Sequence, residues 1–110
     1  MNDKMLKKYL PLSEATFYTL LSLTKPMHGY AIMQFVENLS GGAVKLGAGT
    51  LYGILGKLEK EEIIEIYAEV DRKKSYILTE NGRYLLEKEL ARLNRLVSNA
   101  NSVLAKGVGF

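Results

Sequence analysis

The chain has 110 residues, of which 47% are hydrophobic, and carries a formal net charge of +3. A chain of this length can build one modest hydrophobic core, so a second independent domain is not expected. Cysteine is absent, which excludes disulfides and thiolate metal sites, and no run reaches the ~18 apolar residues of a membrane span. We therefore expect a soluble, cytoplasmic protein that does not contact membranes.

Charge is distributed unevenly along the chain. A net charge of +3 is too small by itself to indicate a nucleic-acid partner, but local clusters can still give the molecule a positive side. The basic residues gather near the start and in one triplet, at Lys4, Lys7, Lys8, Arg72, Lys73 and Lys74. Acidic residues crowd the stretch before the triplet, at Glu59, Glu61, Glu62, Glu65 and Glu69.

Two short helices are expected in the first 40 residues. Ser13 is a good N-cap, and Lys25-Pro26 ends the apolar helical face that follows it. A second helix is expected from Gly29 to Leu39, where apolar residues surround the helix and Gly41 lies in its stop signal.

A third helix is expected from Leu46 to Lys60, with Gly47 at the N-cap position. One face repeats apolar residues at helical spacing, which predicts a stripe that packs on a core, at Leu51, Ile54, Leu55 and Leu58. The opposite face lacks side chains, at Gly49, Gly53 and Gly56, and has polar residues beside it, at Thr50, Tyr52, Lys57 and Lys60.

The glycine face requires an explanation, because each interior glycine destabilises a helix by about 1 kcal/mol relative to alanine. A face without side chains allows the backbone to approach a large partner closely, while hydroxyls and cations at its edges bind that partner. Nucleic acid has these properties, although a marginal solvent-facing helix would show the same pattern. Only the neighbouring elements can distinguish these alternatives.

From Ile64 the apolar period changes from helical to alternating. Apolar and polar residues alternate up to Val70, which predicts a half-buried strand, and a polar turn over 71–74 leads into a returning strand over 75–78. Three helices followed by a hairpin with a basic tip are the order of a winged helix-turn-helix. In that fold the third helix enters the major groove and the hairpin reaches the phosphates or the minor groove.

Thr79 is expected to cap a last helix that runs to about Lys106. Its apolar residues follow a heptad spacing over nearly three heptads, at Leu86, Leu90, Leu93, Val97, Ala100 and Leu104. The helix is too long for a small core to cover, so the heptad seam predicts a homodimer. A helix that folds back on its own domain is the alternative. The dimer is favoured over it, because Leu85, Leu96 and Val103 offer a second stripe that can serve both the domain and another chain.

The predicted fold is therefore mainly α, of the α+β class, with a two-stranded wing and a long C-terminal dimerisation helix. We expect a DNA-binding domain over 1–78, a dimerisation helix over 79–106 and a flexible tail over 107–110.

Three sequence motifs resemble those of the PadR family of bacterial transcriptional regulators, and specifically its short subclass. They are His28-Gly29-Tyr30-Ala31-Ile32, the stretch from Gly49 to Glu59, and Tyr76-Ile77-Leu78-Thr79-Glu80-Asn81-Gly82-Arg83. Each motif is weakly specific, but their order and spacing together are specific. The resemblance covers roughly 12–104, and it implies double-stranded DNA as the partner.

The resemblance also implies which residues lie at the DNA. Gly49, Thr50 and Tyr52 match positions at the DNA, and Gly53 lies on the same glycine face. Tyr30 and Lys57 match positions beside phosphates, and the wing contributes Arg72, Lys73 and Lys74. The turn between the strands is shorter than in many members of the family, which favours phosphate contact over insertion into the minor groove.

Multidrug-responsive members of the family hold planar ligands between tryptophans of the dimer helix. This chain has Leu93 at the matching position and no tryptophan, so aromatic sandwiching is not expected. Binding of a small apolar or aromatic effector between subunits remains an alternative, with Tyr9, Phe17 or Leu93 near the effector. These residues also suit a core.

No cofactor, metal site or enzymatic activity is expected. His28 is the chain's one histidine, and without cysteine it lacks the partners of a zinc site or a catalytic base. We interpret His28 as a structural residue that is hydrogen-bonded locally at a helix start.

The predicted function is a sequence-specific transcriptional regulator, and specifically a repressor that acts as a homodimer on a two-fold-symmetric operator. A winged-helix module that binds a protein is the main alternative. An architectural DNA binder without sequence preference is another, and it would show no preference over competitor DNA.

Overall fold

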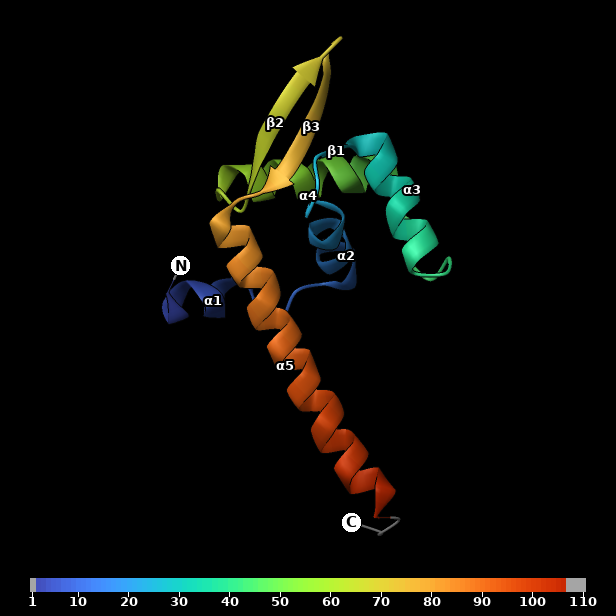
Figure 1. The fold of residues 1–110 in the computed structure, drawn as a ribbon, viewed down its shortest axis with the longest axis vertical. Coiled ribbons are helices and arrows are strands. Elements are labelled where there is room, and N and C mark those ends of the chain that lie inside the picture. The colour runs from blue at the N-terminus through green and yellow to red at the C-terminus, as the bar shows by residue number, and fades with distance from the viewer. Residues whose placement is uncertain (1, 107–110) are drawn as a thin grey trace.

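The computed structural model describes residues 2–106, and the predicted flexible tail over 107–110 lies outside the described residues. Its helices and strands, in chain order, are α1 (Asp3–Tyr9), α2 (Glu14–Ser22), β1 (Met27–His28), α3 (Gly29–Leu39), α4 (Ala48–Lys60), β2 (Ile64–Val70), β3 (Lys73–Leu78) and α5 (Glu80–Ala105). The predicted winged helix-turn-helix is confirmed, with the three expected helices α2, α3 and α4, a hairpin and a long C-terminal helix in the expected order (Figure 1).

The helix ends follow the capping residues of the sequence. The side chain of Ser13 accepts a hydrogen bond from the amide of Thr16, and that of Thr79 accepts one from the amide of Gly82. Such bonds satisfy amide groups that have no partner within the helix. Gly47 occupies the N-cap of α4 as predicted, so this helix begins at Ala48 and not at Leu46.

Two elements were not predicted. Helix α1 begins after Asn2, whose side chain accepts a hydrogen bond from the amide of Met5, and it buries Leu6. Strand β1 has only two residues, which is too short for a periodic signal, and it pairs antiparallel with β3. The sheet therefore has three strands in the order β1-β3-β2.

The hairpin turn is tighter than the predicted turn over 71–74. Val70 pairs with Lys73, so the turn itself contains only Asp71 and Arg72. Their φ angles are 51° and 65°, which is the left-handed backbone that a two-residue hairpin turn with the twist of the strands requires.

The expected half-buried strand is buried only at its start. Ile64 is 1% exposed, whereas Val70 is 66% exposed, because the hairpin projects beyond the helices (Figure 1). The alternation of side chains along β2 is also interrupted. Ile66 pairs with Tyr76 and Ala68 pairs with Ser75, so β2 has one extra residue between these two pairs.

The core lies where α2, α3, α4 and the start of α5 meet the sheet. Leucine and isoleucine dominate it, at Leu20, Leu23, Ile32, Leu51, Leu55, Leu58, Ile63, Ile64, Leu85 and Leu86. The apolar face predicted for 46–60 is thus confirmed as the buried face of α4 at Leu51, Leu55 and Leu58.

A buried carboxylate joins the first turns of α5 to the segment before α2. Glu89 is 1% exposed, its Oε2 accepts a hydrogen bond of 2.7 Å from the amide of Leu12, and its carboxylate forms an ion pair with Arg92. The hydrogen bond from Arg92, the largest effect, and that from Leu12 keep the pKa of Glu89 below its usual range.

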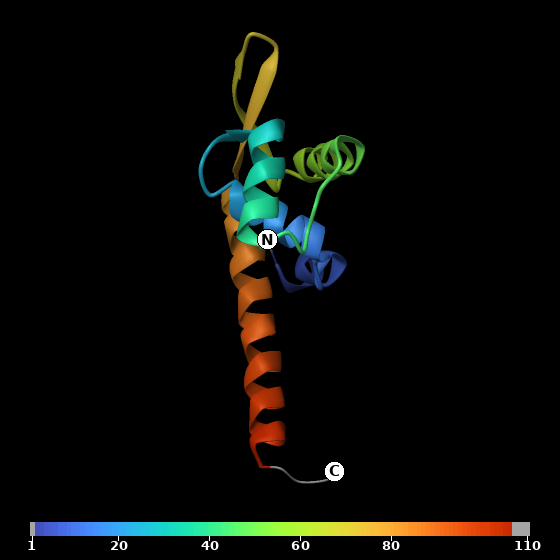
Figure 2. The same ribbon diagram turned by 90° about the vertical axis from the view of Figure 1, so that its right-hand side faces the viewer.

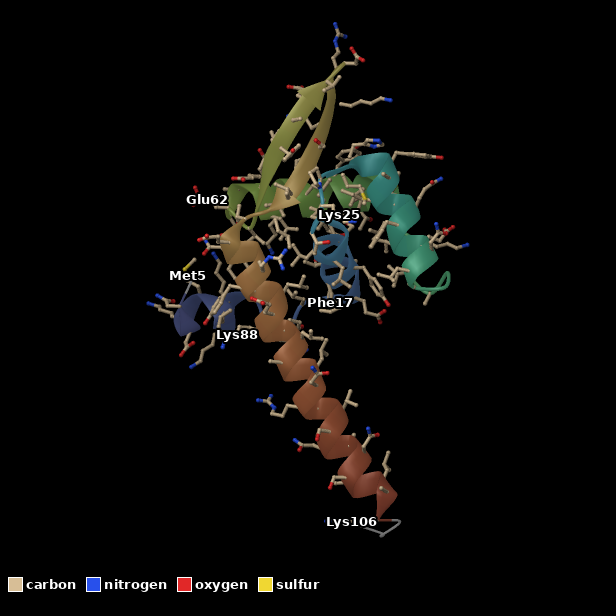
Figure 3. All side chains as sticks on the ribbon, viewed as in Figure 1. Met5, Phe17, Lys25, Glu62, Lys88 and Lys106 are labelled. Carbon is tan, nitrogen blue, oxygen red and sulfur yellow. The ribbon has the colours of Figure 1, made fainter. Side chains whose placement is uncertain are left out.

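Beyond these turns α5 leaves the body of the protein. The hairpin and α5 extend from opposite ends of the helical body (Figure 2), and the end of α5 toward Lys106 stands apart from the other described elements (Figure 3). Every residue from Asn94 to Lys106 is exposed. Leu86 is buried in the protomer itself, whereas Leu90, Val97 and Leu104 are 50%, 57% and 68% exposed. Within residues 2–106, no helix combines the length and apolarity needed to cross a membrane.

Candidate nucleic-acid interface

A hollow of about 310 Å³, here called the basic hollow, opens between the start of α3, the first half of α4 and the hairpin. Three cations, three tyrosines, a histidine and a glycine line it, namely Arg72, Lys73, Lys74, Tyr30, Tyr52, Tyr76, His28 and Gly29. Five of the nine residues that the sequence predicts at DNA therefore share one concave surface, although they come from three separate parts of the chain.

Tyr52 reaches the basic hollow by crossing the first residue of α3. A Cβ atom on Gly29 would lie 2.5 Å from the hydroxyl oxygen of Tyr52, which is well inside van der Waals contact. Glycine therefore allows α4 to place this ring against the start of α3. The sequence predicted both residues within family motifs but not their contact, because they lie more than 20 positions apart.

The tyrosines offer hydroxyl groups at the rim and the floor of the hollow. Tyr30 and Tyr52 are 63% and 54% exposed, and the hydroxyl of Tyr30 accepts a hydrogen bond of 3.0 Å from Nε2 of Gln34. That bond leaves the proton of Tyr30 free to be donated. Tyr76 is buried, and desolvation raises the pKa of its phenol, so this ring stays uncharged. Neutral hydroxyls are suitable donors to phosphate oxygens.

The cations of the wing form no ion pair within the described residues. Among residues 2–106 the salt bridges join Lys8 to Glu61 and Arg92 to Glu89, so neither involves Arg72, Lys73 or Lys74. All three wing side chains are exposed. An unneutralised cation at a surface gains free energy from binding a phosphate, because bound counterions are released.

The glycine face of α4 is open, as the sequence predicted. A Cβ atom at Gly49, Gly53 or Gly56 would meet no atom within 4 Å, and all three residues are exposed. The helix therefore presents bare backbone to its surroundings on the side opposite its buried leucines. Nothing within the described protein explains these glycines by packing.

Tyr52 borders the glycine face on one side, and Thr50 and Lys57 border it on the other. Lys57 does not line the basic hollow. It lines a second hollow of about 260 Å³, which also contains Tyr9, Thr16 and Ile54 and lies toward α1. The predicted residues of α4 therefore flank its open face on both sides.

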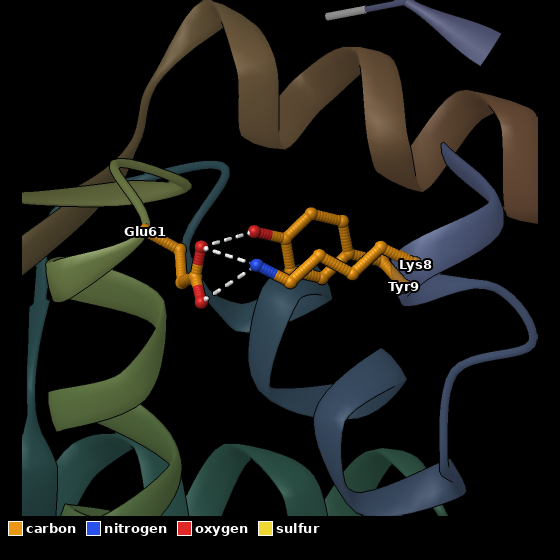
Figure 4. A network of polar contacts seen from close by, with 3 residues as sticks. All are labelled: Lys8, Tyr9 and Glu61. Carbon is orange, nitrogen blue, oxygen red and sulfur yellow. Dashed lines mark hydrogen bonds and ion pairs between the residues drawn. The ribbon is translucent and has the colours of Figure 1, made fainter. Parts of the chain in front are cut away.

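Helix α1 is attached to the end of α4 through Glu61 (Figure 4). The hydroxyl of Tyr9 donates to Oε2 of Glu61 over 2.5 Å, and Nζ of Lys8 lies 3.4 Å from both carboxylate oxygens. Burial, followed by this hydrogen bond, raises the pKa of Tyr9 to about 12, while the bond from Tyr9 and the charge of Lys8 lower the pKa of Glu61. Lys8 is thus an ion-pair partner, not a free phosphate ligand.

His28 does not have the local hydrogen bond that the sequence interpretation expected. It is the N-cap residue of α3, but its side chain makes no capping hydrogen bond, and it is exposed beside the wing. In the part of the chain that the structure describes, no three His, Asp or Glu residues converge on a point where a metal could bind.

Known proteins resemble this chain in sequence and in fold. The model of the transcriptional regulator PadR-like family matches residues 18–88. An uncharacterized 37.1 kDa protein in transposon TN4556 of Streptomyces fradiae is 42% identical over 71 residues, which cover 64% of this chain and 20% of that protein. The transcriptional regulator YqjI of Escherichia coli strain K12 is 37% identical over 60 residues, which cover 54% of this chain and 29% of YqjI.

A solved structure supports the same relationship. The PadR-like transcription factor of Bacteroides fragilis has 25% identity and a TM-score of 0.66, with 91% of this chain and 94% of that chain covered. The family match extends from α2 into α5, so it contains the basic hollow and the whole of α4. The chain therefore belongs to the PadR-like family of transcriptional regulators, which implies that it binds DNA.

Proposed function

We propose that the protein is a homodimeric repressor that binds a two-fold-symmetric DNA operator through α4 and the basic hollow. The observation that carries this proposal is the open glycine face of α4 beside three unpaired wing cations. A bare helix face suits the major groove, while Tyr30 and the wing suit the phosphates on one side of it.

The side chains on α4 that reach base edges are few. Thr50 and Tyr52 can each donate to a base or to a phosphate, and Lys57 lies two turns of helix further along. We propose that Thr50 and Tyr52 supply the sequence preference, whereas Lys57 and the wing contribute affinity without sequence preference.

The homodimer is supported by the exposed apolar side chains of α5. Leu90, Val97 and Leu104 lie on one stripe at heptad spacing and are each at least half exposed. Leu93 and Ala100 complete the stripe. A second copy of α5 would remove these side chains from water, and it would relate the two α4 helices by a two-fold axis.

We propose repression as the mode of action, because a protein that occupies an operator excludes other proteins from that stretch of DNA. We further propose that half-sites lie about one helical turn of DNA apart and that the protein acts in the cytoplasm, where bacterial DNA is found.

Release by a small apolar or aromatic effector completes the proposal. Tyr9 lines the second hollow beside α1, and Phe17 and Leu93 are half-buried. If a panel of phenolic acids and planar cations shifts neither the melting temperature nor the DNA affinity, these classes of effector are excluded.

Fluorescence anisotropy tests the DNA proposal directly. The duplex upstream of the protein's own gene is compared with a scrambled duplex at several salt concentrations. We expect preferential binding with a log-log salt slope of several units, because several phosphates are contacted. Equal binding to both duplexes would indicate an architectural protein or a wrongly chosen operator.

A protein-binding module remains the second candidate, because an open glycine face also suits close packing against another protein. The quadruple variant Lys57→Gln, Arg72→Gln, Lys73→Gln, Lys74→Gln separates the two functions. DNA binding should weaken and lose most of its salt dependence in this variant, whereas protein docking would tolerate it. Absence of DNA binding by the wild type even at low salt would favour the module.

A further inference from the structure

His28 lies at the junction between the wing and the helix-turn-helix. It ends β1, pairs with Ser75 of β3 and occupies the N-cap position of α3. Its side chain is exposed and makes no capping hydrogen bond, so the imidazole does not stabilise the start of α3 as an N-cap side chain could.

His28 lies between two concave surfaces. It lines the basic hollow and also a neighbouring hollow of about 290 Å³ with Val70, Asp71, Lys73 and Ser75. Lys73 is common to both hollows. His28 is therefore placed beside the cations of the wing, where a phosphate would be bound.

The groups around His28 are mostly cations and neutral phenols. The charged and titratable side chains that line these two hollows with it are Lys73, Lys74 and Tyr76 from β3, Asp71 and Arg72 from the turn, Tyr30 from α3 and Tyr52 from α4. Three positive charges thus face one carboxylate, that of Asp71. A phosphate bound in the basic hollow would place negative charge beside these cations and beside His28.

Histidine is the side chain that changes charge between about pH 5 and 8. A neutral imidazole is a weak phosphate ligand, whereas an imidazolium offers a charge-assisted hydrogen bond. The permanent cations of the wing cannot vary in this way. We propose that His28 is a proton-dependent ligand for a DNA phosphate in the basic hollow, so that DNA affinity rises as the pH falls toward 6.

This inference rests on the proposed DNA binding and adds a residue that the sequence interpretation treated as structural. Since the protonated form is the one that binds phosphate, DNA binding must take up a proton. DNA affinity should therefore rise as the pH falls. As the pH rises, affinity should decrease to the level that the cations of the wing provide by themselves.

Anisotropy titrations at about pH 6 and about pH 8 and constant ionic strength test the proposal. We expect the wild type to bind about three- to tenfold more tightly at the lower pH, a range typical of one histidine gaining one phosphate contact. His28→Gln should bind with the same affinity at both pH values, close to that of the wild type at the higher pH. His28→Lys should bind tightly at both.

The salt dependence gives an independent measure of the same contact. For the wild type the log-log slope should be steeper at about pH 6 than at about pH 8 by up to about one unit, the value for one additional neutralised phosphate. His28→Gln should show one slope at both pH values. This readout distinguishes a phosphate contact from a general effect of pH on folding.

The wild type also allows a test without substitution. Since the chain has one histidine, its imidazole proton resonances in NMR spectra are assigned without ambiguity. Adding the operator duplex should move the midpoint of their titration to higher pH. An unchanged midpoint, or the same pH dependence of affinity in His28→Gln, overturns the proposal. Absence of DNA binding at both pH values would instead overturn the proposed function.

Discussion

The hydroxyl oxygen of Tyr52 lies 2.5 Å from the point where Gly29 would carry a Cβ atom, so the Tyr52 ring of α4 rests on the first residue of α3. Because the atoms in contact are the far end of an exposed side chain, Gly29→Ala can be accommodated by moving the ring. We therefore expect this variant to lose less than about 1 kcal/mol of stability but several-fold in DNA affinity.

A double-mutant cycle checks this coupling. Once Tyr52→Ala has removed the ring, Gly29→Ala should have little further effect on DNA affinity, so the two losses should not add. Anisotropy on the four proteins gives the coupling energy. Additive losses would show that the contribution of the Tyr52 ring to DNA affinity does not depend on Gly29.

Gly82 is constrained far more strongly than Gly29. A Cβ atom at Gly82 would lie 2.1 Å from the carbonyl oxygen of Ile63, which is backbone and also accepts a hydrogen bond from the amide of Thr79. We expect Gly82→Ala to lower the free energy of unfolding by about 2–4 kcal/mol, because a strand start or the helix must shift.

Gly56→Ala is the matched control in urea denaturation. Its Cβ would meet nothing within 4 Å, so the same chemical change should stabilise α4 by about 1 kcal/mol. Equal effects of the two substitutions would contradict the close approach of α5 to Ile63.

Arg72 adopts a left-handed backbone at the wing tip, with φ of 65°. Glycine is favoured at this position of a two-residue hairpin turn, so Arg72→Gly should raise the free energy of unfolding by about 0.5–1 kcal/mol. The same change removes a cation, and the salt slope of DNA binding should fall by about 0.9. Thermal denaturation and anisotropy on one preparation test both effects.

Lys74→Gly is the control for that substitution. Lys74 lies within β3 and pairs with Glu69, where glycine weakens a strand. It should therefore destabilise the protein while lowering the salt slope to a similar extent. Stabilisation by both variants would indicate that the turn geometry is not the cause.

The buried carboxylate of Glu89 should make stability sensitive to acid. Because its pKa is lowered in the folded protein, its contribution is complete above the unfolded value near 4.5 and is lost as the pH falls through the folded value. Glu89→Gln should cost about 2 kcal/mol near pH 7, since Arg92 loses its partner.

The acid effect is tested by urea denaturation at two pH values. The difference between wild type and Glu89→Gln should shrink as the pH falls below about 4.5, because protonation of Glu89 at its lowered pKa removes the charge that the substitution also removes. Glu87→Gln, at an exposed position on the same helix, should show no such convergence. A constant difference would mean that the Glu89 charge does not contribute.

The exposed stripe of α5 should control assembly. Val97→Asp places a charge in the proposed seam and should weaken the dimer at least tenfold, because a buried carboxylate without a partner is strongly unfavourable. Ser98→Asp adds the same charge on another face of α5 and should leave assembly unchanged. Sedimentation distinguishes the 12.3 kDa monomer from twice that mass.

The sequence by itself determined the helices that show a regular spacing of apolar residues or begin at a capping residue. The bounds of α3, the N-caps of α4 and α5 and the end of α5 near Lys106 agree with the structure, because apolar spacing and capping side chains are local properties. The face of α4 that would be buried was also predictable, since leucines at helical spacing must find a core.

Only the tertiary structure decided which residues meet. Contacts such as Tyr52 with Gly29, Tyr9 with Glu61 and Glu89 with Leu12 join residues far apart in the chain, so no local pattern encodes them. The two-residue strand β1 and the short α1 carry too few residues for a periodic signal. The basic hollow arises in the same way, because pairing of β1 with β3 is what brings His28 beside the cations of the wing.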